Sequence, residues 1–230
     1  MIALSSQTFT DVATALGWPN SSDATRGMGG ADYDQDGDPD VYLQNQGSTS
    51  RLLRNDGASF TNVTTAMAVS HASSGWSCAW GDFDNDGRPD LYLGNFQGNN
   101  LFQNRFPTAF TDVSLANGTA DATFAQSVVW VDHDRDGDLD LYLTKELDPH
   151  RFFENRGDGT FLDLTAQTGL ADPQSHSYGV SFGDFDRDGD PDVYVSTCGT
   201  GVVNRLFRNE LGNGGGLLYT EIGAAAAVDV

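Results

Sequence analysis

Basic side chains are scarce in this chain of 230 residues: 12 lysines and arginines stand against 33 aspartates and glutamates, and the formal net charge at pH 7 is -21. Nucleic acids and anionic membrane surfaces attract proteins through a basic footprint, so the charge argues against both as partners. No apolar run approaches the ~20 residues that a helix needs to cross a bilayer, so no membrane insertion is expected. Met1–Thr10 lacks the basic start and apolar middle of a signal peptide. This leaves a cytosolic protein or the mature domain of an exported precursor.

Cysteines and catalytic motifs are also scarce. Cys78 and Cys198 do not indicate a disulfide framework, so we expect two unpaired thiols. The sequence has no G-x-S-x-G, no H-E-x-x-H and no glycine-rich phosphate loop. We therefore do not expect an enzyme. The least favoured alternative is an enzyme with its site at the centre of the top face, which a loss of activity on substitution of His71 or His176 would support.

What the chain does have is one acidic segment of nine residues, present four times. Its first, third, fifth and ninth residues are aspartate in every copy, and its sixth is glycine. The copies start 50, 50 and 52 residues apart and hold 19 of the 33 acidic residues. Such a fixed period is typical of a repeat protein. The copies are D-Y-D-Q-D-G-D-P-D (32–40), D-F-D-N-D-G-R-P-D (82–90), D-H-D-R-D-G-D-L-D (132–140) and D-F-D-R-D-G-D-P-D (184–192).

Carboxylates at this spacing are typical of a tight loop that wraps oxygen ligands around Ca²⁺. Position seven is an arginine, Arg88, in the second copy. Because an arginine side chain cannot ligate a cation, position seven is expected to offer its backbone carbonyl, and the preceding glycine permits the turn. Position twelve is apolar where an EF-hand requires a bidentate glutamate, so the sequence predicts a strand–loop–strand site.

Without a cation, four or five carboxylates crowded into nine residues repel one another, which disfavours folding. We therefore predict about four structural calcium ions, one per repeat. The predicted ligands are Asp32, Asp34, Asp36, Asp38, Asp40, Asp82, Asp84, Asp86, Arg88, Asp90, Asp132, Asp134, Asp136, Asp138, Asp140, Asp184, Asp186, Asp188, Asp190 and Asp192, of which Asp38, Arg88, Asp138 and Asp190 act through the backbone carbonyl.

Four strand-like segments align in every repeat. A run of small residues precedes the acidic loop, and a β-branched and aromatic segment such as D-L-Y-L follows it. A third segment such as R-L-F-R-N ends at a turn, and the fourth reads F-T-D-V or similar. Four short strands per repeat predict an all-β fold, a β-propeller of four four-stranded antiparallel blades, whereas a β-solenoid uses a shorter period. We expect one domain, 1–230, with blades at roughly 26–64, 76–114, 126–165 and 178–223.

A further copy of the fourth segment, Phe9–Val12, precedes the first complete repeat. As an extra outer strand, 9–12, it can pair with the last blade and close the ring, which removes free sheet edges. The alternative is an open fragment of a larger propeller of about seven blades. If the ring is not closed, the chain is able to form oligomers.

The motifs W/F-G-D-x-D-x-D-G-x-x-D-L/V-Y-L/V, N-R-L-F-R-N, G-D-G-T-F and F-T-D-V together resemble the FG-GAP/VCBS repeats, as found beside ASPIC/UnbV domains and, more distantly, in integrin α subunits. The resemblance runs from about Phe9 to Ile222. It implies a calcium-bearing β-propeller that binds proteins or carbohydrates, typically in adhesion outside the cytoplasm. An extracellular, cell-surface or periplasmic location is therefore expected. The chain departs from its relatives in having four repeats where about seven are common.

In a four-stranded blade the acidic loops lie on one face, so the connections between strands two and three and between blades lie on the other. Exposed aromatic residues on that second face could stack on a sugar or anchor a peptide. The alternative is that Trp76 and Tyr178 cap the blade core. The function expected is a binding, adhesion or scaffold module, and the alternative is a set of blades that assembles into a larger or oligomeric propeller. The candidate ligand-face residues are Trp18, Arg26, His71, Trp76, His150, His176 and Tyr178.

Overall fold

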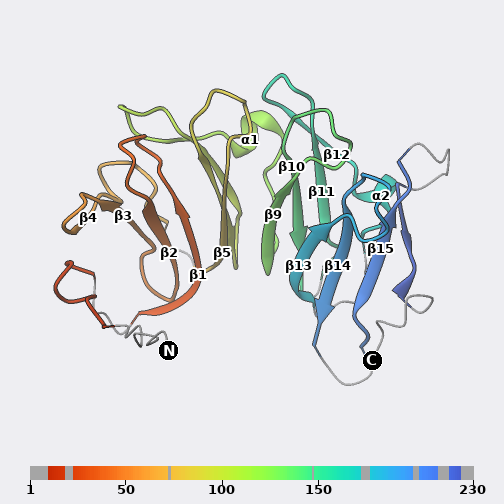
Figure 1. Cartoon of the computed structure of the whole chain (residues 1–230), viewed down its shortest axis with the longest axis horizontal. Coiled ribbons are helices and arrows are strands. Elements are labelled where there is room, and N and C mark those ends of the chain that lie inside the picture. Colours follow the sequence, from red (N-terminus) through yellow and green to blue (C-terminus); the bar gives the residue numbers. More distant parts are fainter. Residues whose placement is uncertain are drawn as a thin grey trace, which may run out of the picture.

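The computed structural model describes residues 10–18, 23–71, 74–146, 148–171, 177–198, 202–211 and 218–223. Their regular structure is almost entirely antiparallel, in four separate sheets of four strands (Figure 1), which confirms the predicted all-β fold of four four-stranded blades. Blade one is β1 (Ala24–Ala31), β2 (Asp40–Gln46), β3 (Arg51–Asn55) and β4 (Phe60–Asn62); blade two is β5 (Gly75–Gly81), β6 (Asp90–Asn95), β7 (Asn100–Gln103) and β8 (Thr111–Asp112); blade three is β9 (Ser127–Val131), β10 (Asp140–Thr144), β11 (Arg151–Asn155) and β12 (Phe161–Asp163); blade four is β13 (Ser177–Gly183), β14 (Asp192–Thr197), β15 (Arg205–Asn209) and β16 (Tyr219–Glu221).

Two short helices, α1 (Ser114–Asn117) and α2 (Thr165–Thr168), follow the outer strands of blades two and three. Each ends at a glycine in the left-handed conformation, Gly118 (φ 88°) and Gly169 (φ 79°), where a residue without Cβ avoids a steric clash. No helix in the described part of the chain is long and apolar enough to cross a bilayer.

The second strand of each blade is its most buried element. In β6, for example, Leu91, Tyr92 and Leu93 are all fully buried. Neighbouring blades cover both faces of such a strand, and the sequence D-L-Y-L is therefore apolar without alternation. The strand order in each sheet follows the chain order, so every blade is a simple up-and-down meander.

Successive blades pack face to face through three hydrophobic cores, one at each junction. Between blades two and three, Tyr92 and Leu101 of blade two meet Leu141 and Phe153 of blade three. Residues at the same repeat positions build the other two junctions. Because one thin sheet cannot bury both of its faces, the stack of blades is the stable unit.

A buried tyrosine in each of the first three blades binds the connection that leaves the blade. Its hydroxyl donates a hydrogen bond to a backbone carbonyl, which satisfies the polar end of an otherwise apolar contact. The pairs are Tyr42 with Val69 (3.0 Å), Tyr92 with Thr119 (3.2 Å) and Tyr142 with Leu170 (3.3 Å).

The blades form an arc of neighbours. The inner strand β1 contacts β5, β5 contacts β9 and β9 contacts β13, but the described residues make no comparable contact between β1 and β13. Blades one and four lie at opposite ends of the molecule in Figure 1. Of the two arrangements that the sequence leaves open, the described residues therefore form the open one.

The predicted closing strand is not found on blade four. Phe9 lies outside the described residues, and the residues from Thr10 to Val12 form no strand. Among the described strands, β16 pairs with β15 alone. The reason is distance: residues 10–18 lie against blade one, at the other end of the arc.

The N-terminal segment takes a definite place on blade one. The Phe60 N–H donates to the Leu16 carbonyl (2.7 Å), and Trp18 stands edge-on to Phe60 with ring centres 5.1 Å apart. The same contact recurs inside the molecule, where the Phe110 N–H of blade two donates to the Met67 carbonyl in the connection from blade one (3.1 Å). Residues 10–18 thus occupy the position of a connection from a preceding blade.

Candidate metal centres and the opposite face

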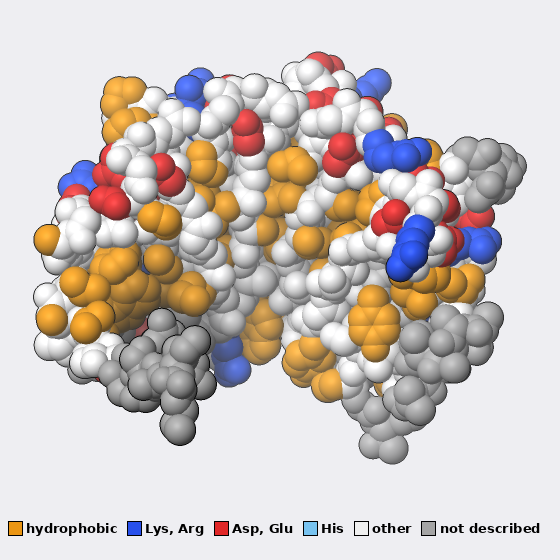
Figure 2. Space-filling model, in the orientation of Figure 1, with side chains coloured by type: hydrophobic (Ala, Val, Ile, Leu, Met, Phe, Trp, Pro, Cys, Tyr) orange, Lys and Arg blue, Asp and Glu red, His pale blue; other side chains and the backbone are white. Residues whose placement is uncertain are grey.

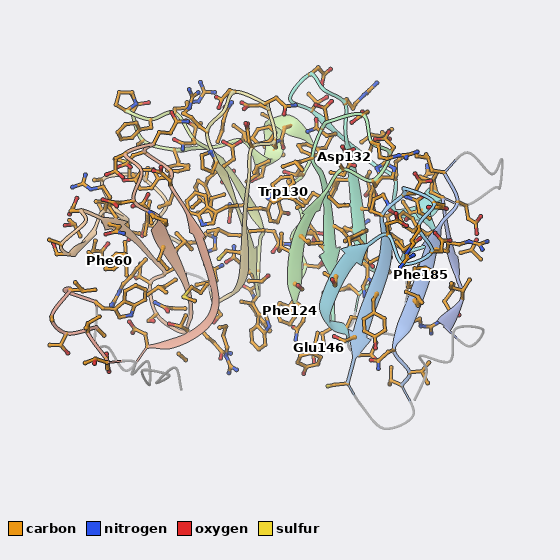
Figure 3. All side chains as sticks on the ribbon, in the orientation of Figure 1. Phe60, Phe124, Trp130, Asp132, Glu146 and Phe185 are labelled. Atoms are coloured by element: carbon orange, nitrogen blue, oxygen red, sulfur yellow. The ribbon has the colours of Figure 1, made fainter. Side chains whose placement is uncertain are left out.

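The four acidic loops join the first strand of each blade to the second, so they share one end of the strands. In Figure 3 Asp132 lies at that end, and Phe124 and Glu146 lie at the other. The glycine at position six has φ between 87° and 98° in every copy. Position four is also left-handed, with φ between 56° and 67°. The sequence does not predict this conformation, because no glycine stands there. The four residues are Gln35, Asn85, Arg135 and Arg187.

Three carboxylates converge in every loop, one oxygen of each lying within 4.8 Å of the other two. Positions one, three and five converge in the first three loops, and positions one, three and nine in the fourth. In the third loop His133 joins a second such group with positions three and nine. The groups are Asp32, Asp34 and Asp36; Asp82, Asp84 and Asp86; Asp132, Asp134 and Asp136; His133, Asp134 and Asp140; and Asp184, Asp186 and Asp192.

Backbone N–H groups of each loop turn toward its own carboxylates. In the second loop Asp82 accepts hydrogen bonds from the N–H of Asp86 (3.0 Å) and of Gly87 (2.8 Å), and Asp86 accepts one from Arg88 N–H (3.0 Å). The other loops repeat most of these bonds. The backbone of each loop is therefore folded around its own aspartates.

The aspartate at position nine is buried and fastens the loop to the third strand. In blade two, Asp90 Oδ2 accepts the N–H of Phe83 (3.1 Å) and Oδ1 accepts the N–H of Asn104 (2.7 Å). Asp40, Asp140 and Asp192 make the same two bonds. Burial raises the pKa of Asp90 to about 8 and that of Asp40 to about 6, because a charged carboxylate loses hydration there.

Three of the loops contain a buried carboxylate oxygen that accepts no hydrogen bond from the described residues and that a cation could bind. Asp34 Oδ1, Asp84 Oδ1 and Asp132 Oδ1 are buried and have no hydrogen-bond partner among the described residues. A buried acceptor without a donor destabilises a fold, and hard cations such as Ca²⁺ bind carboxylate oxygens in tight acidic loops. The residues present therefore fit a calcium ion.

Arg88 is the residue at position seven of the second loop. Its guanidinium pairs with the Asp86 carboxylate, and its Nε donates to the Asn104 carbonyl (3.2 Å). The Arg88 side chain is thus engaged with its own blade.

His133, at position two of the third loop, differs from the aromatic residues at this position in the other loops. It is 2% exposed and its Nδ1 lies 2.6 Å from Asp140 Oδ2. Burial lowers the pKa of His133, but the hydrogen bond and the charge of Asp140 outweigh this, so that the pKa is raised.

Position four links each of the first three loops to the loop that follows it. Gln35 Nε2 donates to the Gly87 carbonyl (2.6 Å), and Asn85 Nδ2 donates to Asp138 Oδ1 (2.6 Å). Arg135 forms an ion pair with Asp190 Oδ1 (2.8 Å). The sequence gives no signal for these contacts, since they depend on the left-handed backbone at position four.

The opposite face carries a row of aromatic side chains near the inner strands. The guanidinium of Arg26 lies 4.9 Å from the ring centre of Trp76. Trp76 stands edge-on to Phe124 at 5.1 Å, and Phe124 contacts Phe96 at 5.2 Å. Phe96 is 53% exposed. We call Arg26, Trp76, Phe124 and Phe96 the aromatic row; sequence reasoning missed Phe96 and Phe124, which lie on loops without a repeat pattern.

The remaining predicted ligand-face residues are dispersed. Tyr178 is exposed on blade four, and Trp18 packs against Phe60 of blade one. His71 is partly buried, and burial lowers its pKa. His176 lies outside the described residues. His150 is 1% exposed and does not lie on the surface, because its ring nitrogens contact the Tyr142 hydroxyl (2.6 Å) and the Ser177 hydroxyl (3.0 Å) inside the fold.

Stacked four-stranded blades with an acidic loop in each define a repeat protein of the β-propeller class. The model of the FG-GAP-like repeat matches residues 32–93, 82–143 and 148–195. The chain belongs to this family, which is generally non-enzymatic.

The chain is similar to parts of larger proteins. It is 50% identical to cartilage acidic protein 1 of Homo sapiens over 48 residues, which cover 21% of this chain and 7% of that protein. It is 43% identical to cartilage acidic protein 1 of Xenopus tropicalis over 70 residues, 30% of this chain and 10% of that protein. A solved Agrocybe aegerita lectin that recognises non-reducing terminal N-acetylglucosamine matches with a TM-score of 0.50 and 17% identity, over 91% of this chain and 54% of the lectin chain. The chain thus spans about half of the lectin and a tenth or less of the curated relatives.

Proposed function

We propose that this protein is a calcium-stabilised β-propeller module for binding, adhesion or scaffolding, in which the calcium ions are structural. The observation that carries the proposal is the convergence of three carboxylates in each of four loops. In three of these loops a buried carboxylate oxygen accepts no hydrogen bond from the described residues. An ion in each loop would neutralise the repulsion and hold the first hairpin of the blade. The ligands are those predicted, with position seven contributing its carbonyl.

The proposal includes a location outside the cytoplasm. Extracellular calcium modules commonly bind at about 0.1–1 mM, and loops of this kind would be filled in an extracellular, cell-surface or periplasmic setting.

Thermal unfolding with and without calcium tests the structural role. We expect a lower melting temperature after chelation and a recovery on adding excess Ca²⁺, because an ion that binds the folded state alone stabilises it by mass action. Replacing Asp84 by Asn should reduce the bound calcium by about one ion per chain, measured by metal analysis after dialysis. Unchanged melting after chelation would show that the ions are not structural.

The ligand of the module is proposed to be a carbohydrate or a protein segment that contacts the aromatic row. Flat rings with a cation beside them suit the apolar face of a sugar or an aromatic anchor. A glycan array and a pull-down with the calcium-loaded protein are the first measurements. Trp76→Ala should abolish any binding found, whereas Leu115→Ala, at a residue 88% exposed on α1, should not. Binding that survives Trp76→Ala would place the ligand elsewhere.

A further inference from the structure

The face of blade four that points away from blade three is built like a blade junction, but no other described blade packs on it. Phe185, at position two of the fourth loop, is 45% exposed, although the residues at this position in the other loops are at most 3% exposed. In Figure 3 Phe185 lies over blade four. With Tyr194 and Leu206 it lines a hollow of ≈ 250 Å³. Their counterparts Tyr92 and Leu101 are buried in the junction of blades two and three.

Each internal junction carries one hydrogen bond from an asparagine at the end of a third strand to the position-two carbonyl of the preceding blade. The bonds are Asn104 to Tyr33 (2.8 Å), Asn155 to Phe83 (2.7 Å) and Asn209 to His133 (2.9 Å). At the two ends of the arc the described residues do not complete this bond. Among the described residues, no side chain donates to the Phe185 carbonyl, and Asn55 Nδ2 donates to the Pro39 carbonyl of its own blade alone.

The contact made by position four is also incomplete at the end of the arc. Arg135 pairs with Asp190 of the following loop, but the described residues include no partner for the guanidinium of Arg187. At the other end, no described side chain donates to the carboxylate of Asp38, which stands at the same loop position as Asp190. One end therefore presents a cation and a carbonyl acceptor, and the other presents an anion and an amide donor.

The free face of blade one has the remaining features of a junction. Val41 and Phe60 stand at the repeat positions of Leu91 and Phe110, which are buried between blades one and two. Met28 is 66% exposed. Figure 2 shows hydrophobic side chains gathered over the blade-one end of the molecule.

We propose that blade one of a second copy of this chain covers the free face of blade four. The contact would reproduce the three internal junctions, with Asn55 donating to the Phe185 carbonyl and Arg187 pairing with Asp38. Since each copy has both ends, two copies can close on one another. The eight blades of such a ring lie within the range of four to eight that propellers use.

The new junction differs from the internal ones at one position. Blade one has Gly30 where the other blades place Trp80, Trp130 or Phe182 against their predecessor. The apolar contribution of blade one then comes from Met28 and Trp18, which line one hollow together with Leu43.

Sedimentation or light scattering of the full chain in calcium tests the proposal. The expected mass is about twice the 24.7 kDa of one chain. Phe185→Asp should give a monomer. The dissociation constant of the dimer should rise at least ~30-fold, which is the effect of losing a buried interface anchor. Because Phe185 is half-exposed in a single chain, its replacement should leave the melting of the monomer nearly unchanged. Leu162→Asp, at a residue that is also 45% exposed but lies on β12, is the matched control and should remain dimeric.

A charge exchange identifies the two ends. Arg187→Asp and Asp38→Arg should each weaken the dimer by a few-fold, as an exposed ion pair does, and the double variant should recover it. Arginine is tolerated at this loop position, as Arg88 demonstrates. A monomeric wild-type protein at every concentration measured, or a dimer unaffected by Phe185→Asp, would overturn the proposal. Chains that lengthen with concentration would overturn the closed pair. None of these results bears on calcium binding, which the chelation experiment measures separately.

Discussion

A single buried carboxylate joins each acidic loop to the third strand of its blade. Asp90 receives two backbone N–H groups from two different segments, Phe83 and Asn104. The spacing of the aspartates predicts its side chain as a calcium ligand, which stays a prediction. The second role was not predictable, because the donors are backbone groups that carry no sequence signal.

This carboxylate makes the calcium-free protein sensitive to pH. The folded-state pKa of Asp90, about 8, and of Asp40, about 6, lie above the ordinary value of 3.8. The folded state therefore keeps protons that the unfolded chain releases, and stability falls as the pH rises from about 4 to about 8. We expect denaturant unfolding in calcium-free buffer to show this fall. Saturating calcium should flatten it, because bound calcium favours the ionised form; a calcium-free protein that gains stability over this range would contradict the assignment.

At the same scale, the hydroxyl of Tyr92 tests how far one hydrogen bond supports a junction. Tyr92→Phe leaves the Thr119 carbonyl without its donor and should cost about 1 kcal/mol of unfolding free energy. Tyr178→Phe is the control, since Tyr178 is 46% exposed, and should change stability little. Equal effects of the two substitutions would show that the buried bond contributes nothing.

At the scale of the element, the first hairpin of each blade depends on backbone conformation as much as on charge. The sequence predicts its two strands and the glycine turn, because the apolar strands and Gly137 are visible in the residue types. It does not predict the left-handed Arg135 (φ 63°), since arginine adopts this conformation only when the loop enforces it. The inter-loop contacts were missed for the same reason.

The glycine of the hairpin gives a clean comparison. A Cβ at Gly137 would meet no atom within 4 Å, yet its φ is 94°; a Cβ at Gly183 also meets nothing, and its φ is not in the left-handed region. Gly137→Ala should therefore destabilise the protein by about 1–2 kcal/mol through backbone strain alone. Gly183→Ala should have a much smaller effect. Unfolding in urea of both variants in calcium measures the difference, and equal losses would rule out strain as the cause.

At the scale of the whole molecule, the repeat pattern predicts the number of blades and their strands, because every blade repeats the same residue types. The pattern does not determine whether the ring closes, because closure depends on the small rotation between blades, which no single residue sets. The placement of residues 10–18 on blade one was likewise not predictable, because its contacts come from Leu16 and Trp18, which lie outside the outer-strand motif.

The reactivity of the two cysteines measures whether the blades stay packed on one another. Cys198 is exposed, whereas Cys78 packs against the core between blades one and two, and burial raises its pKa to about 12. A thiol reagent should modify one cysteine rapidly in calcium and the second only on unfolding. Chelation should speed the second reaction if the calcium ions hold the stack together. Rapid modification of both thiols in calcium would contradict the packing of blade two on blade one.

The contact made by position four also favours one order of the blades along the chain. Gln35 donates to a backbone carbonyl, which any following loop can provide. Arg135 instead pairs with a carboxylate, so its contact needs an acidic residue at position seven of the next loop. If blade two were moved to follow blade three, Arg88 would face Arg135 and the two cations would repel. The loops therefore restrict the order of the blades, besides binding any ion. In chains with the blades rearranged, we expect orders that place Arg88 after Arg135 to be less stable than orders that place an aspartate there.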